Sequence, residues 1–373
     1  MPDDAYPYRL PTDSAKLRQN NFDLLRLLFA GTVCLVHVYE LSGYQELAWV
    51  KNVLSSAVAV KSFFVVSGFL IFMSYERSGS ILSYSAKRAR RIYPAYFTVV
   101  TGCAIGLCLL STRPFDQYFS MEFVRYVTAN LTFLNFLGPS LPGVFEGHRF
   151  AAVNGALWTL KIEVMFYAVV PLCVYFFRRF GVLPVMTAVY IGAVGYTIIM
   201  VELSHTSFHA AGFYLQLSRQ LPGQMSYFMA GAFFYYFFKV FERHTFLFLT
   251  AAVLILFMGR LFPGSLVFNE ILYPMGLATG VVFCGMCFYL GNFGKYGDFS
   301  YGVYIIHFPL IQSLLVLWPG MSPWTFFMIS ILLASVISVM LWHLVEKHFL
   351  LKGSHYRITA RQAYAKAITP RSV

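Results

Sequence analysis

Apolar residues run through this chain in stretches of about twenty, which short polar segments separate. Wound into a helix, such a stretch matches the apolar core of a bilayer, which is about 30 Å thick. The pattern therefore predicts an all-α fold, a polytopic transmembrane helical bundle whose single domain covers 22–350. About ten spans are expected, near 22–43, 52–74, 92–112, 155–177, 182–201, 221–241, 245–260, 271–290, 299–318 and 323–346.

The composition supports the same conclusion, because it excludes a soluble domain. Hydrophobic residues make up 58% of the 373 residues and charged residues only 12%, whereas about a quarter of a soluble domain is charged. The first fifteen residues hold Pro2, Pro7 and Pro11 and no signal-peptide pattern, so the first span is expected to stay in the protein.

Basic residues are distributed unevenly between the segments that connect the spans. Nineteen of the 28 Lys and Arg residues fall on one side of the predicted bundle, six on the other and three within spans. Because basic segments stay on the cytoplasmic side, both termini are predicted to be cytoplasmic in a multi-pass integral membrane protein. Residues 1–21 then form a cytoplasmic segment and residues 351–373 a basic tail. Topology explains the net charge of +12 without a nucleic-acid partner, and in a bacterium the membrane would be the cytoplasmic (inner) one.

The six cysteines all lie within predicted spans, so no disulfide framework is expected. Cys284 and Cys287 form a C-x-x-C pair in an apolar helix without further ligands. Such a pair is typical of packing, and no metal site is predicted.

The first span carries three ionisable residues on one helical stripe: Asp23, Arg26 and His37. His37 lies roughly 16 Å deeper than Arg26 at 1.5 Å per residue, near the middle of the bilayer core. Ionisable groups at that depth usually mark a pathway or a reaction site. The alternative is a histidine that bonds a neighbouring carbonyl, with Arg26 as an interfacial anchor.

The second and third spans contribute two further candidates. Lys61 and Ser67, the latter next to Gly68, interrupt an apolar helix either to let helices approach closely or to contact a substrate. Arg88 and Arg91 share one face of a helix, an arrangement suited to an anionic phosphate, although a cytoplasmic cluster of basic residues would look the same.

Polar residues also occur at the ends of later spans. The fourth opens with Trp158 and Glu163, which either stack on and position a sugar or sit at the rim as structural residues. Ahead of it, the semi-apolar segment 130–138 is expected to be re-entrant or interfacial. The polar residues of the last two spans are interpreted as structural, since helix ends tolerate them: Asp298, Ser300, Tyr301, Tyr304, His307, His343, Glu346 and His348.

Five segments follow one another in order and together cover nearly the whole chain: Arg26 and His37 with ten residues between them, FFVVSGFLI, RARRIYPAYF, LWTLKIEVMFY and YGVYIIHFPL. In this order they resemble the acyltransferase family 3 of integral-membrane O-acyltransferases. The family acylates, most often acetylates, surface polysaccharides and related acceptors. The resemblance implies that His37 is the essential histidine and Arg26 the arginine of its motif, that Arg88 and Arg91 are the R-x-x-R pair, and that Glu163 is the family's carboxylate.

The chemistry of acyl transfer agrees with these roles. A hydroxyl is a poor nucleophile until a base takes its proton, and neutral imidazole suits neutral pH, so His37 is the expected base, with Arg26 and Asp23 below it. No cofactor is expected to stay bound; acyl-CoA, most simply acetyl-CoA, would be a co-substrate held at Arg88 and Arg91. The partners are this donor, a glycan or lipid-linked saccharide acceptor, and membrane lipid.

Several alternatives stay open. A polytopic transporter of a small anionic or acyl-bearing substrate would also bury Arg, His, Lys and Glu. Within the enzyme class, the acceptor, the length of the acyl group, and direct or covalent transfer through His37 are all undecided.

Overall fold

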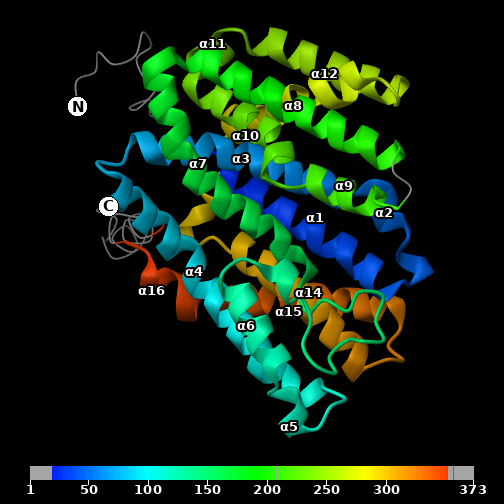
Figure 1. Ribbon diagram of the computed structural model, residues 1–373. Helices are drawn as coiled ribbons and strands as arrows, with labels where there is room; N and C mark the ends of the chain where they lie inside the picture. Colours follow the sequence, from blue (N-terminus) through cyan, green and yellow to red (C-terminus); the bar gives the residue numbers. More distant parts are fainter. Residues whose placement is uncertain (1–18, 207–208, 352–355, 357–373) are drawn as a thin grey trace, which may run out of the picture. The chain divides into compact units, whose positions relative to one another are not determined.

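The computed structural model describes residues 19–206, 209–351 and Tyr356. Every regular element in this described part is helical (Figure 1), which confirms the predicted all-α fold. Seven of its helical segments are long and apolar enough to cross a membrane, as expected of a multi-pass membrane protein. The predicted terminal segments, 1–21 and 351–373, lie almost wholly outside the described residues.

Seven of the ten predicted spans coincide with these long segments. The third is longer than expected, because the basic stretch 87–91 continues the helix of the span rather than forming a loop before it. The long helices are α1 (Phe22–Ser42), α3 (Ser56–Glu76), α4 (Ile81–Gly106), α7 (Trp158–Phe180), α8 (Val182–Thr206), α14 (Ser300–Leu317) and α15 (Pro323–Leu341).

The other three predicted spans are helices of 14 to 17 residues: α10 (Leu221–Tyr236), α12 (Thr245–Leu261) and α13 (Tyr273–Met286). At 1.5 Å per residue they are roughly 21–26 Å long, less than the bilayer core. Local backbone changes shorten α10 and α13 relative to the predicted spans. α10 stops at Phe237 (φ −108°, ψ 26°), after which α11 (Phe238–Arg243) begins, and a π-helical turn, η7 (Val267–Ile271), precedes α13.

Short elements connect the long helices. The segment 130–138 ends α6 (Met121–Leu131) and turns back through η5 (Asn135–Leu137), and the buried Asn130 side chain closes the turn by donating to the carbonyls of Tyr126 and Gly138 at 2.8 and 2.9 Å. The remaining short elements are η3 (Gln45–Leu47), α2 (Trp49–Val53), η4 (Leu107–Leu110), α5 (Phe115–Tyr118), η6 (Gly155–Leu157), α9 (Ala211–Ser218), η8 (Phe293–Lys295), η9 (Trp342–Glu346) and α16 (Lys347–Phe349).

The chain forms two compact units. The first unit comprises Met1–Phe22, Val60–Ser85 and Ile162–Asn292, and the second comprises Asp23–Ala59, Ala86–Lys161 and Phe293–Val373.

In the first unit, α10 is the central helix and packs against α8 and α13. It also approaches α3 closely at two glycines. A Cβ atom added to Gly68 would strike the carbonyl oxygen of Phe228, and one added to Gly231 would strike the carbonyl oxygen of Val65. Gly68 therefore serves helix packing, which is one of the two roles that its sequence context allowed.

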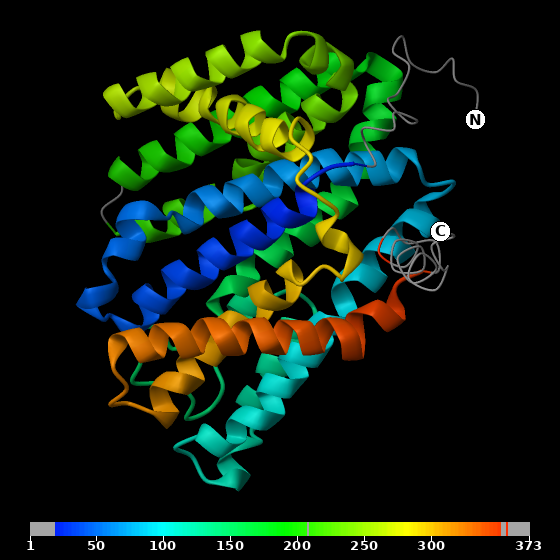
Figure 2. The ribbon, with the colours of Figure 1, turned by 180° about the vertical axis from the view of Figure 1, so that it is seen from behind.

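In the second unit, α14 and α15 pack side by side, as both ribbon views show (Figure 1 and Figure 2). Ser322 caps α15 by accepting a hydrogen bond from the Thr325 amide at 3.4 Å, and Pro323 occupies the first turn. Gly302 faces Ser338, whose atoms lie 2.9 Å from where a Cβ would stand. This close packing holds α14, which carries much of the candidate site.

Candidate functional site

Helix α1 carries the polar residues that the sequence singled out, at two levels. Asp23 and Arg26 lie in its first turns, where Arg26 Nη1 is 3.9 Å from Asp23 Oδ1. His37 lies eleven residues after Arg26, or roughly 16 Å along the axis. The structure thus places Arg26 and Asp23 away from His37, at the distance that the helical spacing predicts.

At the deeper level, His37 meets a second histidine. His37 Nδ1 lies 2.7 Å from His307 Nε2, and the planes of the two rings are nearly parallel, at 17° with centroids 5.0 Å apart. Phe308 adds an edge contact to His37 at 5.4 Å. His307 is fully buried, and its other ring nitrogen, Nδ1, lies 3.0 Å from the Val303 carbonyl oxygen one turn earlier in α14.

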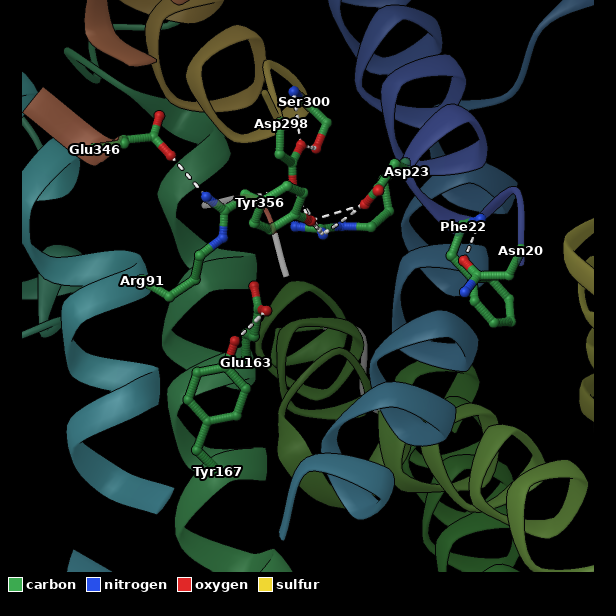
Figure 3. A network of polar contacts seen from close by, with 11 residues as sticks. Asn20, Phe22, Asp23, Arg91, Glu163, Tyr167, Asp298, Ser300, Glu346 and Tyr356 are labelled. Carbon is green, nitrogen blue, oxygen red and sulfur yellow. Dashed lines mark hydrogen bonds and ion pairs between the residues drawn. The ribbon is translucent and has the colours of Figure 1, made fainter. Parts of the chain in front are cut away.

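At the level of Arg26, a buried carboxylate joins several elements (Figure 3). Asp298, just before α14, pairs with Arg26 of α1 at 2.7 Å and with Arg91 of α4. Tyr356 donates to Asp298 Oδ2 at 3.1 Å and to Asp23 Oδ1 at 2.7 Å. We call these residues, together with Ser300 and Glu346, the Asp298 cluster.

Ion pairs decide the charge state of Asp298. Burial by itself would raise the pKa of this carboxyl, but Arg26 and Arg91, with hydrogen bonds from Ser300 and Tyr356, lower it to about 2. Burial and the nearby carboxylates Asp23 and Asp298 keep the pKa of Tyr356 well above its ordinary value, so its hydroxyl remains a donor. Asp298 is therefore ionised at neutral pH and paired with two arginines.

A glycine positions Asp298, the carboxylate at the centre of this cluster. Gly297 has φ +131°, a conformation that side chains rarely adopt, and a Cβ there would collide with the Trp342 indole. The chain can therefore turn beneath Trp342 and deliver Asp298 to the two arginines.

The predicted phosphate-binding pair lies on α4, three residues apart as expected. Arg91 also pairs with Glu346 at 2.9 Å and only 10% of its side chain is exposed, so two carboxylates compensate its charge. Arg88 is half-buried. These ion pairs give Arg91 a structural role besides the predicted one.

Three predicted site residues belong to the first unit. Lys61 lies over the rings of Tyr227 and Tyr273, 5.0 and 5.2 Å from their centroids. Glu163 accepts a hydrogen bond from Tyr167 at 2.5 Å (Figure 3). Ser67 is half-buried on α3. Their roles in substrate binding and catalysis stay predictions.

Trp158 belongs to the second unit and starts α7, half-buried. The next residue, Thr159, bonds to the Tyr304 hydroxyl through its own hydroxyl at 2.6 Å, and the Tyr304 ring lies 6.0 Å from that of His307. The hydrogen bond of Thr159 therefore fixes the backbone next to Trp158 to the turn of α14 that lies just before His307.

The segment before α7 is fixed to α14 as well. Gln312, fully buried, donates to the carbonyls of Phe150 and Ala152 at 2.6 and 3.2 Å and contacts His148 Nδ1 at 2.7 Å. Asn154 donates to the Ile305 carbonyl at 2.8 Å. These bonds hold residues 148–154 against the middle of α14, on both sides of His307.

The sequence interpretation missed two residues that the structure brings to the centre. His307 and Asp298 were assigned to a helix end and read as structural. Because α14 starts at Ser300, His307 actually lies two turns inside the helix, and that depth was the available signal. Among the described residues, no three His, Cys, Asp or Glu side chains form a group that could hold a metal ion.

Comparison with known proteins gives the chemical class. A family described as an acyltransferase domain matches residues 19–343, which extend over both units. The chain is 28% identical over 348 residues to an O-acetyl transferase of Shigella phage Sf6, covering 90% of this chain and 98% of that protein. It is 33% identical over 180 residues to nodulation protein 10 of Rhizobium leguminosarum bv. viciae, covering 43% of this chain and 46% of that protein.

A third relative is the exopolysaccharide production protein ExoZ of Rhizobium meliloti (strain 1021), 32% identical over 139 residues, or 37% of this chain and 40% of that protein. No solved structure is significantly similar to the chain. The family match decides against the alternative of a polytopic transporter. The acyltransferase domain covers residues 19–343, which include all the predicted spans except the end of the last one. With its long apolar helices and this match, the chain belongs to the acyltransferase family and is a membrane acyltransferase.

Proposed function

We propose that this protein moves an acetyl group from cytoplasmic acetyl-CoA to a hydroxyl of an extracytoplasmic or lipid-linked glycan, with His37 as the general base. The observation that carries the proposal is His37 itself, an imidazole that a second imidazole holds about four turns after the start of a membrane-spanning helix of an acyltransferase. The phage relative is named an O-acetyl transferase, and the ExoZ relative acts in exopolysaccharide production. These names favour an acetyl donor and a polysaccharide acceptor.

The transfer needs one base. His37 takes the proton of the acceptor hydroxyl while the hydroxyl oxygen forms a bond to the thioester carbonyl carbon. The carbon–sulfur bond then breaks, and the coenzyme A thiolate recovers the proton from the imidazolium. A positioned base contributes about 10²–10⁴-fold to such a step.

The donor is assigned to the end of the second unit that holds the Asp298 cluster. Arg88 and Arg91 bind its phosphates, and Arg26 with Asp23 orients that end of α1. The pantetheine arm then carries the thioester along α1 toward His37. This end faces the cytoplasm if basic residues set the orientation, and in a bacterium the membrane is the inner one.

The acceptor is assigned to the side of α14 where Trp158 begins α7. An indole can stack on a sugar ring, and the Thr159–Tyr304 hydrogen bond fixes its backbone close to the histidine pair. Lys61 and Ser67 are the further candidates for contacts with substrate, and Glu163 is the alternative base.

The test is ester analysis of surface glycan in the strain that carries this gene. Mass spectrometry of the deletion strain should show the loss of one acetyl ester, which the wild-type gene restores. His37→Ala and His37→Gln should not restore it, although both proteins are expected in the membrane in normal amounts, because glutamine keeps a hydrogen bond but accepts no proton near neutral pH. Near-normal acetylation with His37→Gln would make His37 structural and move the base to Glu163.

A further inference from the structure

The hydrogen bonds of His307 determine which of its nitrogens carries a proton. His307 Nδ1 lies 3.0 Å from the Val303 carbonyl oxygen. A carbonyl oxygen only accepts hydrogen bonds, so Nδ1 must be the N–H nitrogen. If the ring is neutral, its Nε2 carries a lone pair.

The surroundings of His307 favour the neutral ring. The side chain is fully buried, and its ring contacts are with His37, Tyr304 and Phe308, none of which carries a negative charge. A buried cation without a carboxylate partner is costly. The nearest carboxylate along its own helix, Asp298, lies nine residues earlier, roughly 13 Å along the axis, and is paired with Arg26 and Arg91.

The tautomer of His37 follows from that of His307. Since Nε2 of a neutral His307 can only accept, the 2.7 Å contact requires His37 Nδ1 to donate. A neutral His37 then has its lone pair on Nε2. The bond to His307 and the edge of Phe308 hold the imidazole in this orientation.

We propose that His307 is a positioning residue, which fixes the tautomer and orientation of His37 so that Nε2 is the nitrogen that takes the acceptor proton. This inference rests on the proposed role of His37 as the base. When Nε2 receives the proton, the imidazolium still donates from Nδ1 to His307, so the bond between the rings persists through the transfer. When the thiolate takes the proton back, His37 returns to the same tautomer.

Two variants of His307 separate this role from simple packing. In His307→Gln, the amide oxygen can take the place of Nε2 and accept from His37. In His307→Phe, a ring of similar size fills the space and no acceptor remains. His205→Phe, at the exposed end of α8, is the matched control for the same chemical change.

Kinetics gives the first measurement, with acetyl-CoA as the varied substrate and the strain's own glycan in excess. His307→Phe should lower kcat by roughly 10²-fold, the lower range for a misaligned base. Its KM for acetyl-CoA should stay within about twofold of the wild type, because the donor site lies elsewhere. His307→Gln should keep kcat within about tenfold, and His205→Phe should leave it unchanged.

A nitrogen NMR spectrum of purified, ¹⁵N-histidine-labelled protein tests the tautomer without any activity. The His37 signals, identified by their loss in His37→Ala, should show a protonated Nδ1 and a bare Nε2 in the wild type and in His307→Gln. They should show a mixture of tautomers in His307→Phe. The NMR spectrum reports the tautomer of His37 even if a variant is inactive for another reason.

The outcomes separate the inference from the function on which it rests. A wild-type spectrum with protonated Nε2 on His37 overturns the inference, as do equal kcat values for the Gln and Phe variants. If His37→Gln keeps its activity, the proposed function fails instead, whatever the spectrum shows.

Discussion

Asp298 is the carboxylate on which arginines from α1 and α4 converge, and it is almost wholly buried at 1% side-chain exposure. Two guanidinium groups, a serine and a tyrosine offset the cost of burying this charge. The same cluster makes Arg91 a structural residue as well as a candidate ligand for the donor.

Substitutions at the two arginines test the two roles. Arg91→Ala leaves Asp298 and Glu346 with less compensation, and removing one partner of a buried pair typically costs about 3–5 kcal/mol of stability. Arg88→Ala should lose affinity for acetyl-CoA by about 1.5–3 kcal/mol, the value of a hydrogen bond to a charged group. Thermal unfolding and calorimetric binding on the purified proteins measure both.

Arg91→Lys is the matched control, since it keeps the charge without the planar fork that reaches two carboxylates. It should be intermediate in stability. An unfolding temperature of Arg91→Ala equal to that of the wild type would contradict the structural role of Arg91, and unchanged acetyl-CoA affinity in Arg88→Ala and Arg91→Ala would remove the donor site from α4.

At the scale of elements, two contacts fix α1 beside α14. Arg26 meets Asp298 near the start of each helix, and His37 meets His307 deeper in both. Arg26 precedes His37 by eleven residues, and Asp298 precedes His307 by nine. Because the two contacts follow in the same order along both segments, α1 and α14 run in the same direction. The histidine pair is therefore held by an ion pair about three turns away as well as by its own hydrogen bond.

In the first unit the close crossing of α3 and α10 depends on Gly68 and Gly231. Alanine at either position places a methyl group against a backbone carbonyl that cannot move freely, and overpacking of this kind typically costs about 1–3 kcal/mol. Gly68→Ala and Gly231→Ala should therefore lower the unfolding temperature of the protein in detergent.

Gly192→Ala on α8 is the control, because nothing lies within 4 Å of a Cβ there. Alanine favours a helix over glycine by about 1 kcal/mol, so this variant should be neutral or slightly more stable. If all three variants behaved alike, the glycines of α3 and α10 would have no role in packing.

At the scale of the whole molecule, the distribution of basic residues predicts how the chain lies in the membrane. A cysteine at Gly79, between α3 and α4, should be cytoplasmic, and one at Gly147, between α6 and α7, should lie outside. Both glycines are exposed and have open space around a Cβ. In intact cells a membrane-impermeant maleimide should label Gly147→Cys and not Gly79→Cys, on a background in which the six natural cysteines are replaced.

Labelling of both cysteines after the cells are opened shows that each site is reactive. The opposite pattern in intact cells would place the Asp298 cluster outside, and the donor could not then come from the cytoplasm as proposed.

Much of the fold could be predicted, because an apolar stretch of about twenty residues has one stable form in a bilayer. The lengths of α10 and α13 could not, since they depend on a single backbone break at Phe237 and a π-helical turn before Tyr273. For the site, helical spacing was enough to put Asp23, Arg26 and His37 on one stripe. It could not identify His307 as the partner of His37, because that choice depends on which helices pack together.

The Asp298 cluster also has a consequence for biosynthesis. Arg26 leaves the ribosome early, but its ion-pair partner Asp298 lies 272 residues later in the chain. At about 5–20 residues per second, that interval is roughly 14–54 s. During it Asp298 does not yet exist, while Asp23 lies one turn away from Arg26 on the same helix. The first helix is thus made and inserted before the buried carboxylate that later pairs with its arginine.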